Sequence, residues 1–319
     1  MGFPKASKNG EKRLAVLPKD LLSINNVSAL FFEKGYASEH GIEDSEYEKY
    51  GANIAEREQV LSKDIICDPK IGDATYLDEL KDGTIIWGWI HAVQNPKLAK
   101  LLVEKYITVY AWEDMYEEGR HLFYKNNILA GKASIKHALL HYGSTGNKLK
   151  VAVLGKGNVA FGACESLYQL GAEVTVYGRK NEQLFRRELL KYDVLVNAIL
   201  WDTKRLDHII YEKDVKAMKP HTLIIDISCD ENGAIETSYA TSISDPIYVV
   251  HDVFHYAVDN TPSLLYRDAT SAISEVTSRF ADDLIEAQHN QIFSDSCIIS
   301  DGQILDQRII DYQKLHPDQ

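Results

Sequence analysis

The segment 150–180 constrains the fold more than any other part of the chain, because a strand, a glycine turn, a helix and a second strand follow one another there. The apolar run Val151–Leu154 predicts a buried parallel strand, and Glu173–Tyr177 predicts its neighbour. Between them, Gly155–Ala160 has the form G-x-G-x-x-A and leads into a helical pattern that ends at Gly171. A unit of this kind, about 30 residues long, predicts a doubly wound α/β domain with a parallel sheet.

The glycine turn predicts a binding site for the pyrophosphate of a dinucleotide. Gly155 permits the tight turn, Gly157 lets the backbone approach the phosphates, and the small Ala160 lets helix and strand pack closely. The N-terminus of the helix adds free N–H groups and the positive end of its dipole. The alternative is a tight turn in an ordinary α/β domain. The predicted cofactor contacts in this turn are Gly155, Gly157, Asn158, Val159 and Ala160.

The end of the second strand predicts which dinucleotide binds. NAD-binding units usually carry Asp or Glu about 20 residues after the glycines, where the carboxylate holds the ribose hydroxyls. This chain has Gly178, Arg179 and Lys180 at that place, so the carboxylate is missing and two cations are present. Arg179 can form forked hydrogen bonds with phosphate oxygens, which Lys180 cannot. We therefore predict NADP(H) rather than NAD(H); the alternative is a pair of solvated charges at a strand end.

The composition is that of an ordinary globular protein and argues against several partners. The 319 residues are 45% hydrophobic and 26% charged, which is long enough for two domains. The net charge of −12 argues against nucleic acid and anionic membranes, and no run approaches the roughly 18 apolar residues of a membrane span. The N-terminal residues lack the apolar centre of a signal peptide. We therefore expect a cytoplasmic protein.

Four scattered cysteines form no C-x-x-C pair. This pattern favours free thiols in a reducing compartment over disulfides or a zinc site, and we predict no metal. The cysteines are Cys67, Cys164, Cys229 and Cys297.

Strands and helices alternate in the first half of the chain, which predicts a second parallel sheet flanked by helices. This half has no phosphate-binding glycine turn, so we assign it to the substrate. The predicted strands are Ala29–Phe32, Asp64–Asp68, Thr84–Trp89 and Thr108–Ala111. The predicted helices are Pro18–Ile24, Asp44–Tyr50 and Pro96–Lys105.

Two helical patterns predict the connections between the domains. Gly131–Tyr142 is expected to cross into the dinucleotide domain, and the amphipathic Ser271–Gln288 to cross back. We therefore predict a discontinuous substrate domain, 1–132 plus about 272–319, and an NADP-binding Rossmann domain, 133–271. The active site is expected in the cleft between the two domains. Within the Rossmann domain we expect strands Asp193–Leu200 and Thr222–Ser228 and a helix at Glu212–Met218.

Five segments resemble those of the alanine dehydrogenases and related enzymes, in the same order and spacing, from about Gly2 to about Leu284. The resemblance implies that Arg13 binds the substrate carboxylate, that Lys70 binds substrate, and that His91 and Asp230 are catalytic. It also implies that the H-Y-x-V-x-N-x-P element, with Asn260, lies beside the nicotinamide. The segments are Asn9–Pro18, Asp68–Lys70, Trp89–Pro96, Asp226–Gly233 (D-x-x-x-D-x-x-G) and His255–Pro262.

The chain departs from the NAD-linked alanine dehydrogenases in two respects: it is shorter, and its cofactor strand ends in Gly178 and Arg179 instead of an aspartate. Together with the segment Ile66–Asp73, these features are more similar to the N5-(carboxyethyl)ornithine synthases, a smaller NADP-dependent group. That resemblance implies reductive condensation of pyruvate with the side-chain amine of ornithine or lysine. The saccharopine dehydrogenases run similar amine chemistry but are NAD-linked.

The residue types suit this chemistry. Arg13 offers a fork for the carboxylate of a 2-oxo acid, and Lys70 can bind the same carboxylate or polarise the oxo group. His91 has a pKa suited to donating and accepting protons as the amine adds and water leaves. Asp230 could orient or deprotonate the amine. The alternatives are surface charges for Arg13 and Lys70, a core histidine for His91, and a turn cap for Asp230.

Three functions remain open at this stage. The first is the synthase, the second an NADP-linked alanine dehydrogenase that uses ammonia, and the third a non-catalytic NADPH-binding protein. Retention of all four candidate residues argues against the third. We expect small-molecule substrates and a homo-oligomer, and we interpret His255 as packing against the cofactor and Trp87 and Trp89 as sheet packing.

Overall fold

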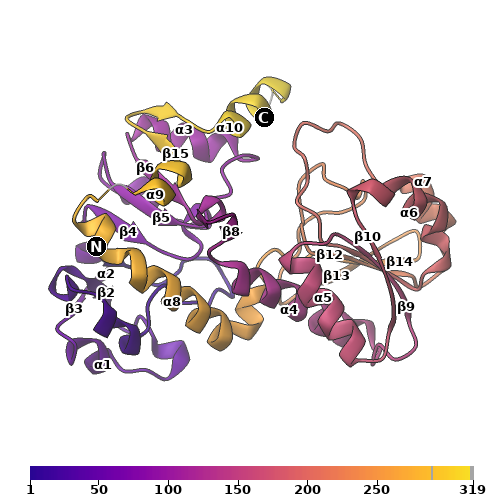
Figure 1. Ribbon diagram of the computed structural model, residues 1–319, viewed down its shortest axis with the longest axis horizontal. Helices are drawn as coiled ribbons and strands as arrows, with labels where there is room; N and C mark the ends of the chain where they lie inside the picture. Colours follow the sequence, from indigo (N-terminus) through magenta and orange to yellow (C-terminus); the bar gives the residue numbers. More distant parts are fainter. Residues whose placement is uncertain (289, 317–319) are drawn as a thin grey trace. The chain divides into compact units, whose positions relative to one another are not determined.

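The computed structural model describes residues 1–288 and 290–316, and the chain divides into two compact units. Figure 1 labels their elements. Unit 1 comprises Met1–Phe123 and Tyr266–Gln319, and unit 2 comprises Tyr124–Leu265. The predicted fold class, two α/β domains with mostly parallel sheets, is confirmed.

The division falls earlier than the predicted boundaries at 132/133 and 271/272, which lie inside helices α4 (Tyr124–Tyr142) and α8 (Tyr266–Ile285). Each helix packs as a whole with its own unit. Thr270 and Ser274, on the first turns of α8, accept the backbone N–H groups of Leu14 and Leu17. Of the predicted segment 272–319, residues 289 and 317–319 lie outside the described residues.

Unit 1 is built on an eight-stranded sheet in the order β16-β15-β6-β5-β4-β1-β2-β3. The six strands from β6 to β3 are parallel, and β15 adds antiparallel to β6. In Figure 1 the yellow C-terminal segment supplies β15 beside the purple β6. The strands are β1 (Gly2–Phe3), β2 (Phe31–Glu33), β3 (Asn53–Ala55), β4 (Ile65–Cys67), β5 (Ile85–Gly88), β6 (Thr108–Ala111), β15 (Cys297–Ser300) and β16 (Gln303–Ile304), with the hairpin β7 (Tyr116–Glu117) and β8 (Arg120–His121).

The helices of unit 1 are mostly short. Pro18–Ser23 is a 3₁₀ helix (η1) rather than an α-helix, and Trp87 and Trp89 are buried, as the interpretation of sheet packing requires. The other helices are α1 (Asp44–Glu48), α2 (Arg57–Leu61), α3 (Pro96–Glu104), α9 (Gln291–Ser296), α10 (Gln307–Leu315) and the 3₁₀ turns η2 (Val27–Ala29), η3 (Ser38–His40), η4 (Ile71–Asp73), η5 (Leu77–Glu79) and η6 (Trp112–Asp114).

Unit 2 is a six-stranded sheet in the order β10-β9-β11-β12-β14-β13, parallel except for the edge strand β13. The strands are β9 (Lys150–Leu154), β10 (Glu173–Tyr177), β11 (Val194–Asn197), β12 (Leu223–Asp226), β13 (Ile247–Val250) and β14 (Val253–Tyr256). The remaining helices are α5 (Asn158–Gln169), α6 (Glu182–Glu188), α7 (Glu212–Ala217), η7 (Arg179–Asn181), η8 (Leu189–Lys191) and η9 (Thr261–Leu265).

Two glycines bring helices α4 and α5 into close contact. A Cβ atom on Gly131 would lie 2.0 Å from the carbonyl oxygen of Val159, and one on Gly162 would lie 2.0 Å from that of Ile128. Only glycine fits at such an approach. Because α5 follows the predicted phosphate turn, this contact fixes the turn against the longest helix of unit 2.

Within residues 1–288 and 290–316, the chain has no helix whose length and apolar character would allow it to cross a bilayer.

Candidate active site

Three neighbouring parallel strands of unit 1 bring chemical groups to one edge of the sheet. Lys70 follows β4, His91 follows β5 and Glu113 follows β6. The carboxyl ends of parallel strands meet at the same edge, which is where α/β sheets bind ligands. Close backbone packing supports this edge, because a Cβ atom on Gly88 would lie 2.0 Å from the carbonyl oxygen of Asp68.

Arg13 lies in a buried ion pair. Its guanidinium donates to both carboxylate oxygens of Glu11, at 2.8 and 2.6 Å, and lies 5.0 Å from the ring centre of Trp89. The two side chains are 3% and 0% exposed, so the alternative of a surface charge is wrong for Arg13. Burial raises the pKa of Glu11, but Arg13 outweighs burial and lowers it. Glu11 therefore holds the fork of Arg13 in a fixed orientation.

Lys70 is also buried, at 7% exposure, and is anchored at both ends. Its backbone N–H donates to Asp68, which also accepts the Tyr76 hydroxyl at 2.6 Å. Its ammonium lies 2.8 Å from Asp73, which a second cation, Lys8, approaches to 2.9 Å. Burial raises the pKa of Asp73, but the two lysines outweigh it and lower the pKa to about 2. Asp73 is thus ionised and fixes the Lys70 ammonium.

His91 stands at the edge with a left-handed backbone, φ 51°. The backbone N–H groups of Ile90 and His91 donate to Glu113, whose carboxylate therefore caps this turn. The imidazole is 60% exposed, so the alternative of a buried core histidine is wrong. Poor solvation by surrounding protein atoms, and then the charge of Lys70, lower the pKa of His91 to about 3. The imidazole is therefore neutral at pH 7.

Sequence reasoning missed Glu113. Burial raises its pKa to about 7, so it is a carboxylic acid close to half ionised at neutral pH. The signal was present: Trp112-Glu113-Asp114 directly follows a predicted strand, and neighbouring parallel strands end together.

In unit 2, the predicted phosphate turn has the expected form. Gly155 adopts φ 127°, and a Cβ atom there would lie 2.5 Å from the carbonyl oxygen of Ala198, so the turn requires glycine. A Cβ atom on Gly157 would meet no atom within 4 Å, which leaves the turn open to a ligand at that point. Helix α5 begins at Asn158 and buries Ala160 against the sheet. A turn of this form, at the N-terminus of a helix, suits an anion bound by backbone N–H groups.

The predicted cofactor-selecting residues border a pocket of about 280 Å³ at the end of β10. Gly178 and Arg179 line it, while Lys180 continues the 3₁₀ turn η7. The side chain of Lys156 covers Gly178, with its Cε 3.1 Å from a Cβ atom built there. Lys156, inside the glycine turn, is thus a third cation at this strand end that the sequence analysis did not assign.

The same pocket contains a carboxylate that sequence reasoning missed. Glu182, four residues after Gly178, lines the pocket, but Arg205 holds it in a bidentate pair at 2.8 and 3.0 Å. Arg205 also binds Asp207 at 2.7 and 2.8 Å and lies 4.6 Å from the ring centre of Trp201. The carboxylate is therefore present but paired with a guanidinium.

The two aspartates of the D-x-x-x-D element differ in environment. Asp226 is buried and accepts hydrogen bonds from Asn197 at 2.9 Å and Ser238 at 2.5 Å, so it is a structural anchor. Asp230 follows in a turn in which Cys229 and Asn232 adopt left-handed backbone. Burial, and then repulsion from Asp226, raise the pKa of Asp230 to about 7. Asp230 can therefore exchange protons near neutral pH.

The H-Y-x-V-x-N-x-P element contains one buried polar group that has no hydrogen-bond partner among the described residues. His255 is engaged at both ring nitrogens, by Thr237 at 2.8 Å and the Val253 carbonyl at 3.1 Å, which favours packing over proton transfer. Asn260 is 3% exposed, and its side-chain NH₂ has no hydrogen-bond partner among the described residues. A buried donor of this kind normally has a partner, so Asn260 fits a cofactor amide.

The residues therefore fit a bound nicotinamide dinucleotide: an open glycine turn, cations at the strand end and an unpaired buried donor. In the described part of the chain, no three His, Cys, Asp or Glu residues come together as a metal site would require. Arg13, Lys70 and His91 belong to unit 1, whereas Asp230 and the cofactor residues belong to unit 2. The predicted cleft between the domains stays a prediction.

Comparison with known proteins matches both units to one family. Residues 2–124 match the model for the alanine dehydrogenase/PNT N-terminal domain, and residues 177–311 match that for the C-terminal domain. The chain is 33% identical to N(5)-(carboxyethyl)ornithine synthase of Lactococcus lactis subsp. lactis (strain IL1403), over 93% of this chain and 97% of that protein. It is 28% identical to alanine dehydrogenase of Bacillus subtilis (strain 168), over 88% and 84%.

Solved structures share the fold. An L-alanine dehydrogenase superposes with a TM-score of 0.80 at 21% identity, covering 99% of each chain. A transhydrogenase from Sinorhizobium meliloti superposes with a TM-score of 0.77 at 17% identity, covering 95% of this chain and 99% of that chain.

Proposed function

Because the chain belongs to the alanine dehydrogenase/PNT family, an assignment that makes it an oxidoreductase acting on CH–NH donors, we propose that it condenses pyruvate reductively with the side-chain amine of ornithine or lysine. With ornithine the product is N5-(1-carboxyethyl)ornithine, and the reductant is NADPH. The observation that carries the proposal is that the fixed guanidinium of Arg13 and the fixed ammonium of Lys70 both lie close enough to the exposed imidazole of His91 to lower its pKa. The choice of substrates rests on the likeness to the Lactococcus lactis synthase.

Arg13 and Lys70 bind the 2-oxo acid. Glu11 orients the fork of Arg13, so the guanidinium meets the pyruvate carboxylate without first reorganising. Lys70, held by Asp73 just after β4, binds the carboxylate or polarises the oxo group.

His91 and Asp230 move protons. A neutral His91 accepts a proton as the amine adds to the oxo carbon and returns it to the departing water. Asp230, with its pKa near 7, takes the proton from the substrate ammonium so that a free amine can attack. At pH 7 the imidazole of His91 is in the neutral form that accepts a proton, and Asp230 is close to half ionised.

The cofactor supplies the hydride. We assign its pyrophosphate to the turn of Gly155, Gly157, Asn158, Val159 and Ala160, and the carboxamide to Asn260. We assign its 2′-phosphate to Arg179 and Lys180 beside Gly178, with Lys156 as a further cation. The pairing of Glu182 with Arg205 supports NADPH over NADH, because an unpaired carboxylate would repel the phosphate more strongly.

The second candidate is an NADP-linked alanine dehydrogenase, favoured by the 28% identity to the Bacillus subtilis enzyme. It would use ammonia in place of ornithine. A non-catalytic NADPH-binding protein is the third, and the buried, preoriented Arg13 and Lys70 argue against it, since binding a dinucleotide needs neither. The proposal includes a cytoplasmic location, which suits four free cysteines, and a homo-oligomer.

Pyruvate-dependent oxidation of NADPH tests the proposal. Ornithine or lysine at millimolar levels should support turnover, and ammonium at the same concentration should be far slower. The product should be a secondary amine with two carboxylates, identified by mass spectrometry. If ammonium reacts as fast as ornithine and the product is alanine, the synthase proposal is wrong and the dehydrogenase is correct.

A further inference from the structure

A groove of about 460 Å³ on unit 1 adjoins the anchor of Lys70. It runs between helix α3 and the segment 72–78, and its volume lies within the range of about 300–1,000 Å³ typical of small-molecule sites. Asp73 belongs to both features: it lines the groove and holds the Lys70 ammonium at 2.8 Å. A ligand in the groove would therefore lie next to the group that we assign to the oxo acid.

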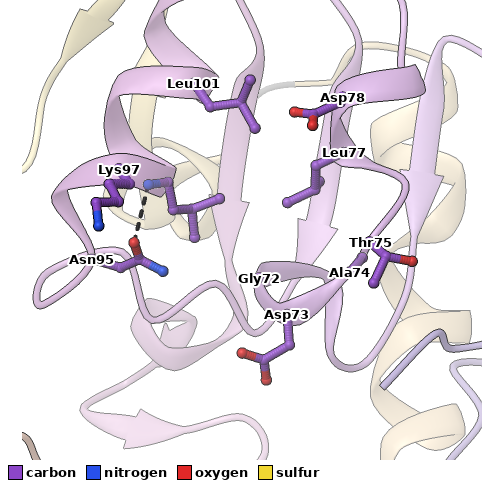
Figure 2. A pocket seen from close by; sticks show the side chains of 10 residues that line it. Gly72, Asp73, Ala74, Thr75, Leu77, Asp78, Asn95, Lys97 and Leu101 are labelled. Atoms are coloured by element: carbon purple, nitrogen blue, oxygen red, sulfur yellow. Dashed lines mark hydrogen bonds between the residues drawn. The ribbon is translucent and has the colours of Figure 1, made fainter. Parts of the chain in front are cut away.

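Three leucines form an apolar part of the groove wall. Figure 2 shows Leu77 and Leu101 pointing toward one another across it, one from the 72–78 segment and one from α3. Leu98 completes the wall on the helix side, and the chain packs tightly beneath, since a Cβ atom on Gly72 would lie 2.0 Å from the Ile90 carbonyl oxygen. Such walls suit a short chain of methylene groups.

Charges of opposite sign stand at the rim. Asp78 lies at the end of the groove away from Asp73, while Lys97 projects from the first turn of α3 (Figure 2). Among the described residues, neither the Asp78 carboxylate nor the Lys97 ammonium has an ion-pair partner. The first turn of α3, capped by Asn95 through its hydrogen bond from Leu98, adds the positive end of the helix dipole on the same side.

We propose that this groove holds the amino-acid end of the amine substrate. The α-carboxylate binds Lys97 and the first turn of α3, the α-ammonium binds Asp78, and the methylene chain lies along Leu77, Leu98 and Leu101. The side-chain amine then reaches the end of the groove at Asp73, beside Lys70. Binding the far end of the substrate in this way positions the reacting amine. The inference rests on the proposed function and assigns its amine subsite.

Steady-state kinetics of the full chain with ornithine, pyruvate and NADPH test the inference. Lys97→Ala and Asp78→Asn should each raise KM for ornithine at least about tenfold, because each removes one charge-assisted contact with the substrate. KM for pyruvate and NADPH should stay within about twofold, and Lys97→Arg should keep most of the ornithine affinity. The matched controls are Lys100→Ala on the same helix and Glu79→Gln beside Asp78; neither residue lines the groove.

A substrate without the α-carboxylate provides a second comparison. With 1,4-diaminobutane, Lys97→Ala should react like the wild type, because the carboxylate that Lys97 binds is missing. If wild type uses ornithine but Lys97→Ala and Asp78→Asn leave its KM unchanged, the subsite is wrong while the proposed function stands. If wild type accepts only ammonium, both are wrong.

Discussion

The Nδ1 atom of His91 lies 4.0 Å from a carboxylate oxygen of Glu113, and the same oxygen accepts the backbone N–H of His91 at 2.7 Å. One side chain therefore fixes the backbone of the candidate catalytic residue and faces its ring. The two residues come from the ends of neighbouring strands, β5 and β6. Experiment can therefore separate the proton transfer that we propose for His91 from the backbone position that Glu113 fixes.

His91→Ala should lower kcat by about 10²- to 10⁴-fold, the range for loss of a general acid–base. NADPH affinity and thermal stability should change little, because the ring is 60% exposed. Turnover with saturating ornithine and fluorescence titration with NADPH measure the two effects. His251→Ala, outside the candidate site, is the control. Near-normal turnover in His91→Ala would remove the assigned role.

The raised pKa of Glu113 predicts that the stability of the protein depends on pH. Burial raises its pKa from 4.5 to about 7, so the folded state binds the proton more tightly than the unfolded chain does. The resulting stabilisation is fully present below pH 4.5 and is lost as the pH rises to about 7. The free energy of unfolding of wild type, measured in urea, should therefore fall relative to that of Glu113→Gln across this interval. A difference that stays constant with pH would contradict the shift, and the exposed Glu48→Gln serves as control.

Arg179→Ala should weaken NADPH binding about 10- to 100-fold, since a charge-assisted hydrogen bond contributes roughly 1.5–3 kcal/mol. NADH binding should be nearly unchanged, because NADH lacks the 2′-phosphate. Gly178→Asp combined with Arg179→Ile should move the preference toward NADH, and the flexible Lys156 can move aside for the new side chain. Isothermal titration with both cofactors, with the exposed Arg187→Ala as control, measures the change. Equal affinity of wild type for NADH and NADPH would end the NADP assignment.

Arg205→Ala should also lower NADPH affinity more than NADH affinity, although no phosphate contact is assigned to Arg205. The substitution releases Glu182 from its bidentate partner and leaves a charged carboxylate lining the pocket. Glu182→Gln in the same chain should restore NADPH binding. This double-mutant comparison isolates the repulsion; a loss that Glu182→Gln fails to rescue would mean that Arg205 acts through Trp201 or Asp207 instead.

The sequence predicted the elements that carry strong local signals. The strands at Thr108–Ala111 and Glu173–Tyr177 have the predicted bounds, because both are short runs rich in β-branched and aromatic residues between clear breaks. Strand β1 was missed because it has only Gly2 and Phe3, and long-range pairing with β2 and β4 is what makes it a strand. Helix α4 begins seven residues before the predicted Gly131, since its polar first turns carry no apolar periodicity.

The candidate site also shows this difference between local signals, which the sequence reveals, and long-range contacts, which it does not. Arg13, Lys70 and His91 were found through family-like segments, yet their partners were not, because partners depend on which strand ends meet in space. Glu113 sits 22 residues from His91 and Arg205 sits 23 residues from Glu182, distances at which no periodicity connects two side chains. Glu182 was not predicted because the carboxylate of NAD-binding units is expected at the strand end, four residues earlier at Gly178.

The paired glycines of α4 and α5 bear on attempts to engineer the cofactor site. Since Gly131 contacts the carbonyl of Val159, inside the G-x-G-x-x-A segment, the position of the turn is set partly by a helix that precedes it in the chain. A loop grafted from another dinucleotide-binding fold would lie against the same helix α4, and its backbone would have to tolerate that contact. The transferable module is therefore the loop together with both helices, and exchanging the glycine segment alone would change its shape as well as its chemistry.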